Sequence, residues 1–212
     1  MATPRDPAPD PTTESLLRRA ARAVDFEGMG APFKRNATYD DLYTIPETWV
    51  GEIIDGDLYA FPRAASPHAV VVTELPALLT PMRHDDSPAG WVILADVEVR
   101  FGKHLLVPDI SGWRRARMLV IPELTVFELA PDWVCEVMSP STARQDRGRK
   151  REIYAAGKVG HIWYLDPVHH TLEVLALDGA TYRVIATAGE DEIGRFAPFE
   201  SIELQLAQLW RR

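Results

Sequence analysis

The 212-residue chain has a single cysteine, Cys135, and no long apolar stretch. One thiol cannot form an internal disulfide, and it cannot supply a zinc or iron–sulfur site built from several cysteines. The longest apolar runs, such as residues 69–72 and 118–121, are far shorter than the roughly 20 residues that span a bilayer. We therefore expect no membrane segment and a buried, inert thiol.

A secretory signal is also missing from the N-terminus, which lacks an apolar core and carries Asp6 and Asp10. We therefore expect a cytoplasmic protein. Four prolines within residues 1–12 favour an extended, flexible tail, and apolar residues at helical spacing predict an amphipathic helix over residues 13–26. The length fits one domain, which we place at residues 13–212.

Positive charge is in short supply as well: 23 basic residues face 31 acidic ones, a formal net charge of −8. This balance argues against a protein that coats nucleic acid by bulk attraction, so a polyanion would need a local basic patch. Two such patches exist, one at Arg114, Arg115 and Arg117 and one within residues 144–151. Charge alone does not decide what either patch binds.

Capping and turn signals predict the first elements of the domain. Thr38 and Asp41 fit a helix-start box before a short helical turn that stops at Pro46. Asp55-Gly56 is typical of a tight hairpin turn. The strands that this turn joins are expected over residues 49–54 and 57–61.

A helix is expected over residues 66–82, because Ser66-Pro67 fits an N-cap followed by proline. Pro76 should kink or split this helix near residues 73–75. Apolar alternation and short apolar runs then predict six strands, with one further helix between the third and the fourth of them. This helix is expected to be capped by residues 139–142 and to end at Gly157. The strands are expected over residues 97–101, 104–113, 132–138, 160–165, 171–176 and 181–187.

Glu136 is the most informative residue, because it interrupts an apolar strand and shares a face with Val134 and Met138. An unpaired ionised carboxylate in such a place costs several kcal/mol, so something must compensate its charge. A salt bridge to an arginine of the following helix would do so, and so would a divalent cation bound by oxygen ligands. The residues alone leave these two interpretations equally weighted.

Asp109 is the second candidate carboxylate. Pro108-Asp109 is a common turn sequence, but apolar residues on both sides favour a strand that continues through it. If this strand is a neighbour of the Glu136 strand, the two carboxylates converge on one Mg²⁺, which suits one or two carboxylates plus waters and phosphate oxygens.

Lys150 is placed near these acids by arithmetic. Glu136 lies three residues, about 10 Å, before the strand end at Ser139. Lys150 lies eight residues, about 12 Å, beyond Thr142, so a helix that folds back over the sheet brings it level with Glu136. Asp146, Lys150 and Tyr154 would share one helix face, which is either a solvated, salt-bridged surface or a partly buried one.

Five segments in this order resemble the Uma family of putative restriction endonucleases, which belongs to the PD-(D/E)xK nuclease superfamily. The likeness extends from about residue 38 to residue 182 with similar spacing. The segments read EIIDGDLY at 52–59, PDI at 108–110, EVMSPST at 136–142, DRGRK at 146–150 followed by Tyr154, and IWYLDP at 162–167.

The resemblance implies an α/β (α+β) restriction-endonuclease-like fold, a single domain with a mixed β-sheet flanked by helices. It implies that Asp109 is the PD aspartate and Glu136 the second acid. The superfamily usually has lysine two residues after the second acid, where this chain has Met138, and Lys150 takes the position of the helix lysine of the Uma-like pattern.

Two further family positions are informative. The family tends to have an aromatic residue where this chain has Gly51, before Glu52. Glu52 is interpreted as a third catalytic acid near the metal, or else as an exposed strand carboxylate. His68 matches a histidine often found in the family and is interpreted as a core or capping residue outside the site.

The leading hypothesis is a metal-dependent endonuclease acting on DNA. Asp109, Glu136 and the backbone carbonyl of Val137 would hold Mg²⁺ or Mn²⁺, and Lys150 would orient the attacking water and stabilise negative charge. Cutting a duplex with one site per chain predicts a homodimer. Contacts to the phosphate backbone are expected from Arg144, Arg147 and Arg151, unless these form a merely solvated helix face.

The rival hypothesis comes from a different class. A catalytically inactive nuclease-fold protein, which binds nucleic acid or a protein partner, would keep the fold and lose its affinity for metal. Other hydrolase classes are disfavoured, because the chain has no G-x-S-x-G elbow, no P-loop and no H-E-x-x-H motif.

Overall fold

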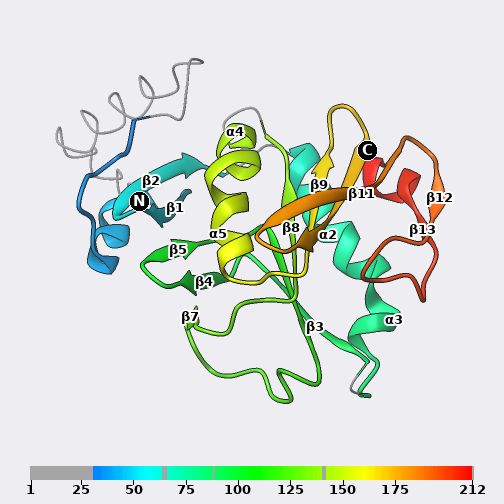
Figure 1. Ribbon diagram of the computed structural model, residues 1–212. Coiled ribbons are helices and arrows are strands. Elements are labelled where there is room, and N and C mark those ends of the chain that lie inside the picture. The colour runs from blue at the N-terminus through cyan, green and yellow to red at the C-terminus, as the bar shows by residue number, and fades with distance from the viewer. Residues whose placement is uncertain (1–30, 64–65, 88, 140–141, 212) are drawn as a thin grey trace, which may run out of the picture.

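The computed structural model describes residues 31–63, 66–87, 89–139 and 142–211 (Figure 1). The tail and the helix expected over residues 1–26 lie outside the described residues. Within the described parts, no helix is long and apolar enough to cross a membrane.

Two mixed β-sheets form the framework of the molecule (Figure 1). Six strands form the larger sheet, in the order β11 (Thr181–Gly189), β10 (Thr171–Asp178), β9 (His161–Asp166), β8 (Trp133–Val137), β6 (Ile110–Arg114) and β3 (Trp91–Ala95). Strands β8 and β9 run parallel and the other neighbours antiparallel. Five strands form the second sheet, in the order β2 (Asp57–Pro62), β1 (Trp49–Ile54), β5 (His104–Leu106), β4 (Glu98–Phe101) and β7 (Val126–Phe127).

Helices and short strands complete the fold. The helical elements are η1 (Tyr39–Thr44), α2 (Ser66–Leu78), α3 (Thr80–Arg83), α4 (Ala143–Gln145), η2 (Asp146–Lys150), α5 (Arg151–Ala156) and η3 (Leu206–Trp210), and η2 is a π-helical segment. Strands β12 (Ile193–Gly194) and β13 (Leu204–Gln205) pair with each other. The mixed α+β architecture with flanking helices confirms the predicted fold class.

Strand β8 lies inside the larger sheet, between β6 and β9, and is buried on both faces. Trp133, Cys135 and Val137 point to one face, where they pack with Val71 and Leu75 of α2. The alternate residues point to the other face, where Val134 and Met138 pack with residues of α5 and the second sheet. Glu136 therefore lies on the face that α5 covers.

The predicted hairpin is confirmed. Strand β1 pairs antiparallel with β2, and the turn residues Asp55 and Gly56 have φ values of 54° and 86°. Positive φ at both central residues is the conformation of a type I′ turn. The helix start is confirmed too, since Asp41 accepts a hydrogen bond from the backbone N–H of Thr38, 2.8 Å away.

Two predictions about continuity are wrong. The strand expected over residues 104–113 is two strands, β5 and β6, which belong to different sheets. Pro108 has no N–H for a ladder, and the N–H of Val107 donates to the Glu52 carboxylate instead, so the chain leaves one sheet and enters the other. Asp109 consequently lies at a bend just before β6, not inside a strand.

The second wrong prediction concerns Pro76, which lies inside α2 without interrupting it. The helical run breaks later, at Leu79, between α2 and α3. Val71 and Leu75 are fully buried against the larger sheet, and this packing outweighs the one backbone hydrogen bond that proline removes.

The rings of Trp91 and Trp133, from the two strands beside β6, both pack over Gly112 of β6. A Cβ atom at this position would lie 2.8 Å from a ring carbon of Trp133 and 3.3 Å from one of Trp91, and both rings are buried. We expect Gly112→Ala to lower the free energy of unfolding by about 1–3 kcal/mol, because a buried ring has to move. Denaturant unfolding measures this, and a loss below about 0.5 kcal/mol would contradict it.

Candidate active site

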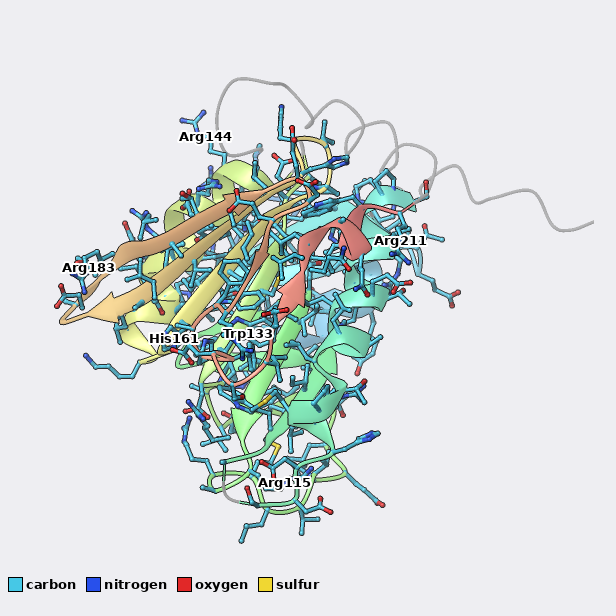
Figure 2. All side chains as sticks on the ribbon, turned by 90° about the vertical axis from the view of Figure 1, so that its right-hand side faces the viewer. Arg115, Trp133, Arg144, His161, Arg183 and Arg211 are labelled. Carbon is cyan, nitrogen blue, oxygen red and sulfur yellow. The ribbon has the colours of Figure 1, made fainter. Side chains whose placement is uncertain are left out.

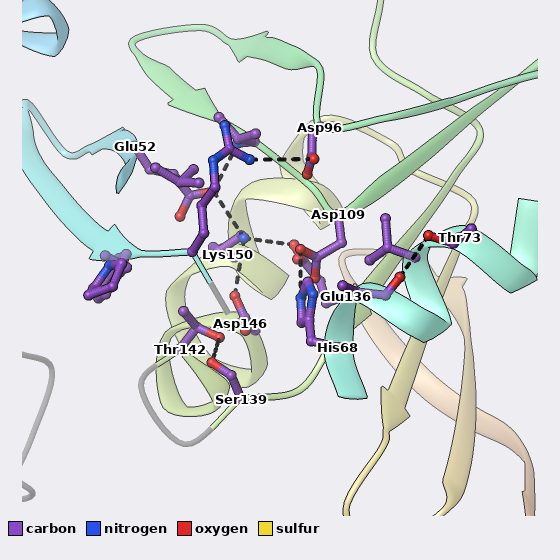
Figure 3. Close-up of a pocket in the computed structure, with 17 residues that line it drawn as sticks. Glu52, His68, Thr73, Asp96, Asp109, Glu136, Ser139, Thr142, Asp146 and Lys150 are labelled. Atoms are coloured by element: carbon purple, nitrogen blue, oxygen red, sulfur yellow. Dashed lines mark hydrogen bonds and ion pairs between the residues drawn. The ribbon is translucent and has the colours of Figure 1, made fainter. Parts of the chain in front are cut away.

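Asp109 and Glu136 lie side by side at the ends of two paired strands (Figure 3). Ile110 of β6 is opposite Cys135 of β8, so continuing this antiparallel register by one residue brings Asp109 opposite Glu136. The Asp109 carboxylate accepts a hydrogen bond from the backbone N–H of Val137, at 2.7 Å. The two acids therefore share one side of the sheet although 26 residues separate them.

Lys150 projects from η2 into a ring of carboxylates (Figure 3). Its Nζ lies 2.8 Å from Glu136 Oε1, 3.0 Å from Glu52 Oε1 and 3.1 Å from Asp146 Oδ1. Only 4% of the lysine side chain is exposed. Three buried acids thus share one ammonium group.

The helix-face stripe of Asp146, Lys150 and Tyr154 is buried, so a solvated surface is excluded for it. The Tyr154 hydroxyl donates to Glu136, and its ring packs edge-on against Phe101. Asp146 is one helical turn before Lys150 and holds it in place. Tyr154 therefore fixes the position of Glu136, and Asp146 fixes that of Lys150.

Glu52 comes from the second sheet, from the buried half of β1. Its Oε1 accepts the N–H of Val107 at 2.9 Å and lies beside Lys150. Because only 6% of the Glu52 side chain is exposed, the interpretation as an exposed strand carboxylate is excluded. Lys150 contacts both Glu52 of the second sheet and Glu136 of the larger sheet, so these ion pairs connect the two sheets at the site.

Burial dominates the electrostatics of this cluster. It raises the pKa values of Glu136, Asp146 and Glu52, and the nearby Lys150 opposes the rise only in part. Burial alone would lower the pKa of Lys150, but the surrounding carboxylates outweigh it and raise that pKa well above its ordinary value. The lysine therefore stays charged, and the cluster has more acid groups than cations to neutralise them.

His68 belongs to this cluster as well. Its Nε2 lies 3.0 Å from Asp109 Oδ1. Burial alone would lower the pKa of His68, but the hydrogen bond to Asp109 and the negative charges of Asp109, Asp96 and Asp146 together outweigh it, so this pKa is raised. The prediction that His68 lies outside the site is therefore wrong, because its side chain contacts Asp109. The position of His68 near the start of a helix did not indicate this contact.

Arg63 and Asp96 lie at the rim of the same pocket, and the sequence had not pointed to either of them. Their side chains make one ion contact of 3.7 Å and are both about half exposed. Asp96 has a positive φ of 52° and donates its N–H to the Asp109 carbonyl at 3.2 Å. Arg63 and Asp96 reach the pocket because of the conformation of their loops, and sequence periodicity does not predict that conformation.

The pocket above the acids has a volume of about 330 Å³. The three arginines expected to contact nucleic acid do not line it. Arg147 instead lies over the Tyr164 ring, 4.7 Å from its centroid, and pairs with Glu173 at 3.0 Å. Arg144 and Arg151 are exposed, and Figure 2 shows Arg144 projecting from the surface.

The donor set fits a hard divalent cation with few protein ligands. Within the described ranges, no three His, Cys, Asp or Glu side chains gather as a ready metal site. Asp109 and Glu136 offer two carboxylates. The N–H of Val137 points toward Asp109, and in an extended strand the N–H and C=O of one residue point to the same side, so the Val137 carbonyl also faces Asp109. Mg²⁺ takes one or two carboxylates and keeps several waters, and the surplus negative charge favours such an ion.

The sequence profile of the Uma2 family, described as "putative restriction endonuclease", matches residues 37–207. The chain belongs to the Uma2 family. The Uma2 match includes all the clustered residues, from Glu52 to Lys150, and confirms the resemblance drawn from the sequence motifs.

A solved structure shares the fold of this Uma2 protein. It is described as the crystal structure of a putative nuclease belonging to DUF820 from Anabaena variabilis. The two chains are 22% identical with a TM-score of 0.66, over 82% of this chain and 97% of the other. No curated protein matches the Uma2 chain.

Proposed function

We propose that this protein is a metal-dependent endonuclease that hydrolyses phosphodiester bonds of DNA. The observation that carries the proposal is the pairing of Asp109 with Glu136 beside a buried, charged Lys150 in one pocket. The description of the Uma2 family and the name of the structural neighbour both support a nuclease.

Asp109, Glu136 and the Val137 carbonyl would hold Mg²⁺ or Mn²⁺. Such an ion, when bound, polarises a phosphoryl oxygen and lowers the pKa of a coordinated water. His68 orients the Asp109 carboxylate through one oxygen, and the Val137 N–H orients it through the other. Tyr154 fixes Glu136 in the same way, so both acids are held before substrate arrives.

Lys150 acts as a fixed positive charge. Its pKa is raised by the surrounding carboxylates, so it keeps its proton at neutral pH and does not serve as a base. From its position beside Glu136 it can donate a hydrogen bond to the attacking water and stabilise negative charge on the phosphate. Glu52 and Asp146 hold the amine there.

Arg144 and Arg151 are proposed to contact the phosphate backbone outside the pocket. Both are exposed, and Arg144 lies two residues from Thr142 of the pocket wall. Arg147 can join them only by leaving Glu173. The homodimer expected from the sequence follows only for a substrate of which both strands are cut.

The second candidate function is a nuclease fold without activity, which binds nucleic acid or a protein. Met138 favours it, because the superfamily lysine position carries a buried thioether here. The two functions differ in metal binding, since an inactive site has no reason to keep affinity for a divalent ion.

The direct test is cleavage of DNA by the purified protein. Supercoiled plasmid and circular single-stranded DNA are incubated with Mg²⁺ or Mn²⁺, and with EDTA in place of metal. We expect metal-dependent cutting of at least one of the two substrates. Absence of cutting on both, with bound metal shown independently, would overturn the proposed function.

Metal binding gives a separate prediction. Calorimetric titration with Mn²⁺ is expected to show binding to the wild type and a loss of affinity of roughly 10- to 100-fold or more in Asp109→Asn, which removes an anionic ligand. The control is Asp178→Asn, an exposed aspartate of β10. Equal affinity in all three proteins would exclude the site at Asp109.

A further inference from the structure

The reacting groups lie deep inside the pocket. Only 2% of the Glu136 side chain and 4% of the Lys150 side chain are exposed. A phosphate that reaches them has to leave the surface and enter the pocket. The volume of about 330 Å³ is at the small end of the roughly 300–1,000 Å³ that ligand pockets span, so there is room for about one nucleotide.

One wall of this pocket is apolar. Phe61, at the end of β2, is paired with Val50 of β1, and both line the pocket. Phe61 is half-buried and belongs to none of the three core clusters in the described part of the chain. Three more wall residues are apolar and partly exposed: Pro62, Ala69 and Val72.

Arg63 is the exposed cation of the rim, directly after β2. Its pairing with Asp96 is a single contact of 3.7 Å between two half-exposed groups, a kind of pair that contributes little. A phosphate can therefore replace Asp96 at low cost. The same pocket is thus lined by a guanidinium and, two residues earlier in the chain, by an aromatic ring, which is the combination that holds a phosphate and a base of a single strand.

We propose that the substrate is single-stranded DNA and that one nucleotide enters this pocket, its base against Phe61 and its phosphate between Arg63 and the paired acids. A base-paired duplex holds its bases stacked inside, and enzymes that need a nucleotide in a pocket act on single strands or extrude it at an energetic cost. The inference rests on the proposed function and names its substrate class. A single strand requires one cut, which one chain can make.

The test compares one labelled oligonucleotide as a single strand and as a blunt duplex, with Mn²⁺. We expect the wild type to cut the single strand at least tenfold faster. Binding is measured separately with Glu136→Gln by fluorescence anisotropy, and we expect the single strand to bind more tightly than the duplex.

Two further substitutions in the Glu136→Gln protein locate the contacts. Phe61→Ala is expected to weaken single-strand binding by roughly 5- to 150-fold, the range for loss of one base–aromatic stack, while Phe61→Trp retains it. Arg63→Ala is expected to weaken binding and to reduce its salt dependence. The controls are Tyr43→Ala, an exposed aromatic outside the pocket, and Arg35→Ala, an exposed arginine in a 3.9 Å pair with Asp57.

The outcomes separate the two proposals. If neither oligonucleotide is cut, and plasmid and circular single-stranded DNA are also left intact by the metal-bound protein, the proposed function fails. If the duplex is cut as fast as the single strand, the function stands and the single-strand inference is wrong. Binding that Phe61→Ala and Tyr43→Ala affect equally would also overturn the assignment of the base to this wall.

Discussion

Glu136→Gln is expected to reduce the rate of DNA cleavage by roughly 10²- to 10³-fold or more, a loss typical of removing one electrostatic contribution to the transition state. Gln has the same shape, so the contact with Tyr154 can persist while the negative charge is lost. The measurement is the initial rate of cutting at saturating Mn²⁺. The matched control is Glu152→Gln, an exposed glutamate of α5.

The same variant has a signature in stability. Burial raises the pKa of Glu136 in the folded protein, so its ionised form is less favourable there than in the unfolded chain. This cost is absent at low pH and appears as pH rises above the unfolded value near 4.5. Relative to Glu136→Gln, the wild type should therefore lose stability as pH rises. A variant that is inactive because it is unfolded would instead be less stable at every pH.

Lys150→Met is expected to cause the largest loss of stability, about 3–5 kcal/mol, because it leaves three buried acids without their shared cation. For a domain of this size that loss corresponds to a fall in Tm of roughly 6–20 °C. Cleavage should be lost as well. Thermal unfolding at neutral pH measures the effect, and Lys103→Met, at a lysine in an exposed ion pair with Asp55, is the control.

Two conditions should reduce the deficit of Lys150→Met. Lowering the pH neutralises the orphaned carboxylates, and Mn²⁺ supplies the missing positive charge when it binds between the acids. If the variant is as stable as Lys103→Met, or if Mn²⁺ stabilises it no more than it stabilises the wild type, the charge balance described for the cluster is incorrect.

Local signals in the sequence predict the elements that local chemistry controls. The hairpin at Asp55-Gly56 follows from two residues that tolerate positive φ, and β8 follows from a short apolar run with one carboxylate. The break at Pro108 was missed, because apolar residues flank it on both sides whether the chain stays in one sheet or changes sheets. Strand β3 was also not predicted, since its run of apolar residues has no alternation.

The site, too, contains residues that the sequence predicted and residues that it did not. Spacing was enough to bring Lys150 level with Glu136, because strand rise and helix rise are fixed quantities. The approach of Asp109 to Glu136 depended on the two strands being neighbours, which spacing alone does not decide, and the family resemblance supplied its role. The contacts of His68, Arg63 and Asp96 depend on how loops and helix starts fold over the sheet edge. Tertiary packing sets the positions of these three residues, and the periodicity of the sequence does not predict that packing.

Lys150 reaches Asp109 and Glu136 from η2, a π-helical segment that follows both acids in the chain and in which Asp146 and Lys150 are buried. A chain that ends before residue 150 would lack not only this cation but also β9, β10 and β11, three of the six strands of the larger sheet. On the proposed roles, the cutting centre can therefore form only after the strands that follow it in the chain have been made, and a shortened chain would lose the activity together with the fold.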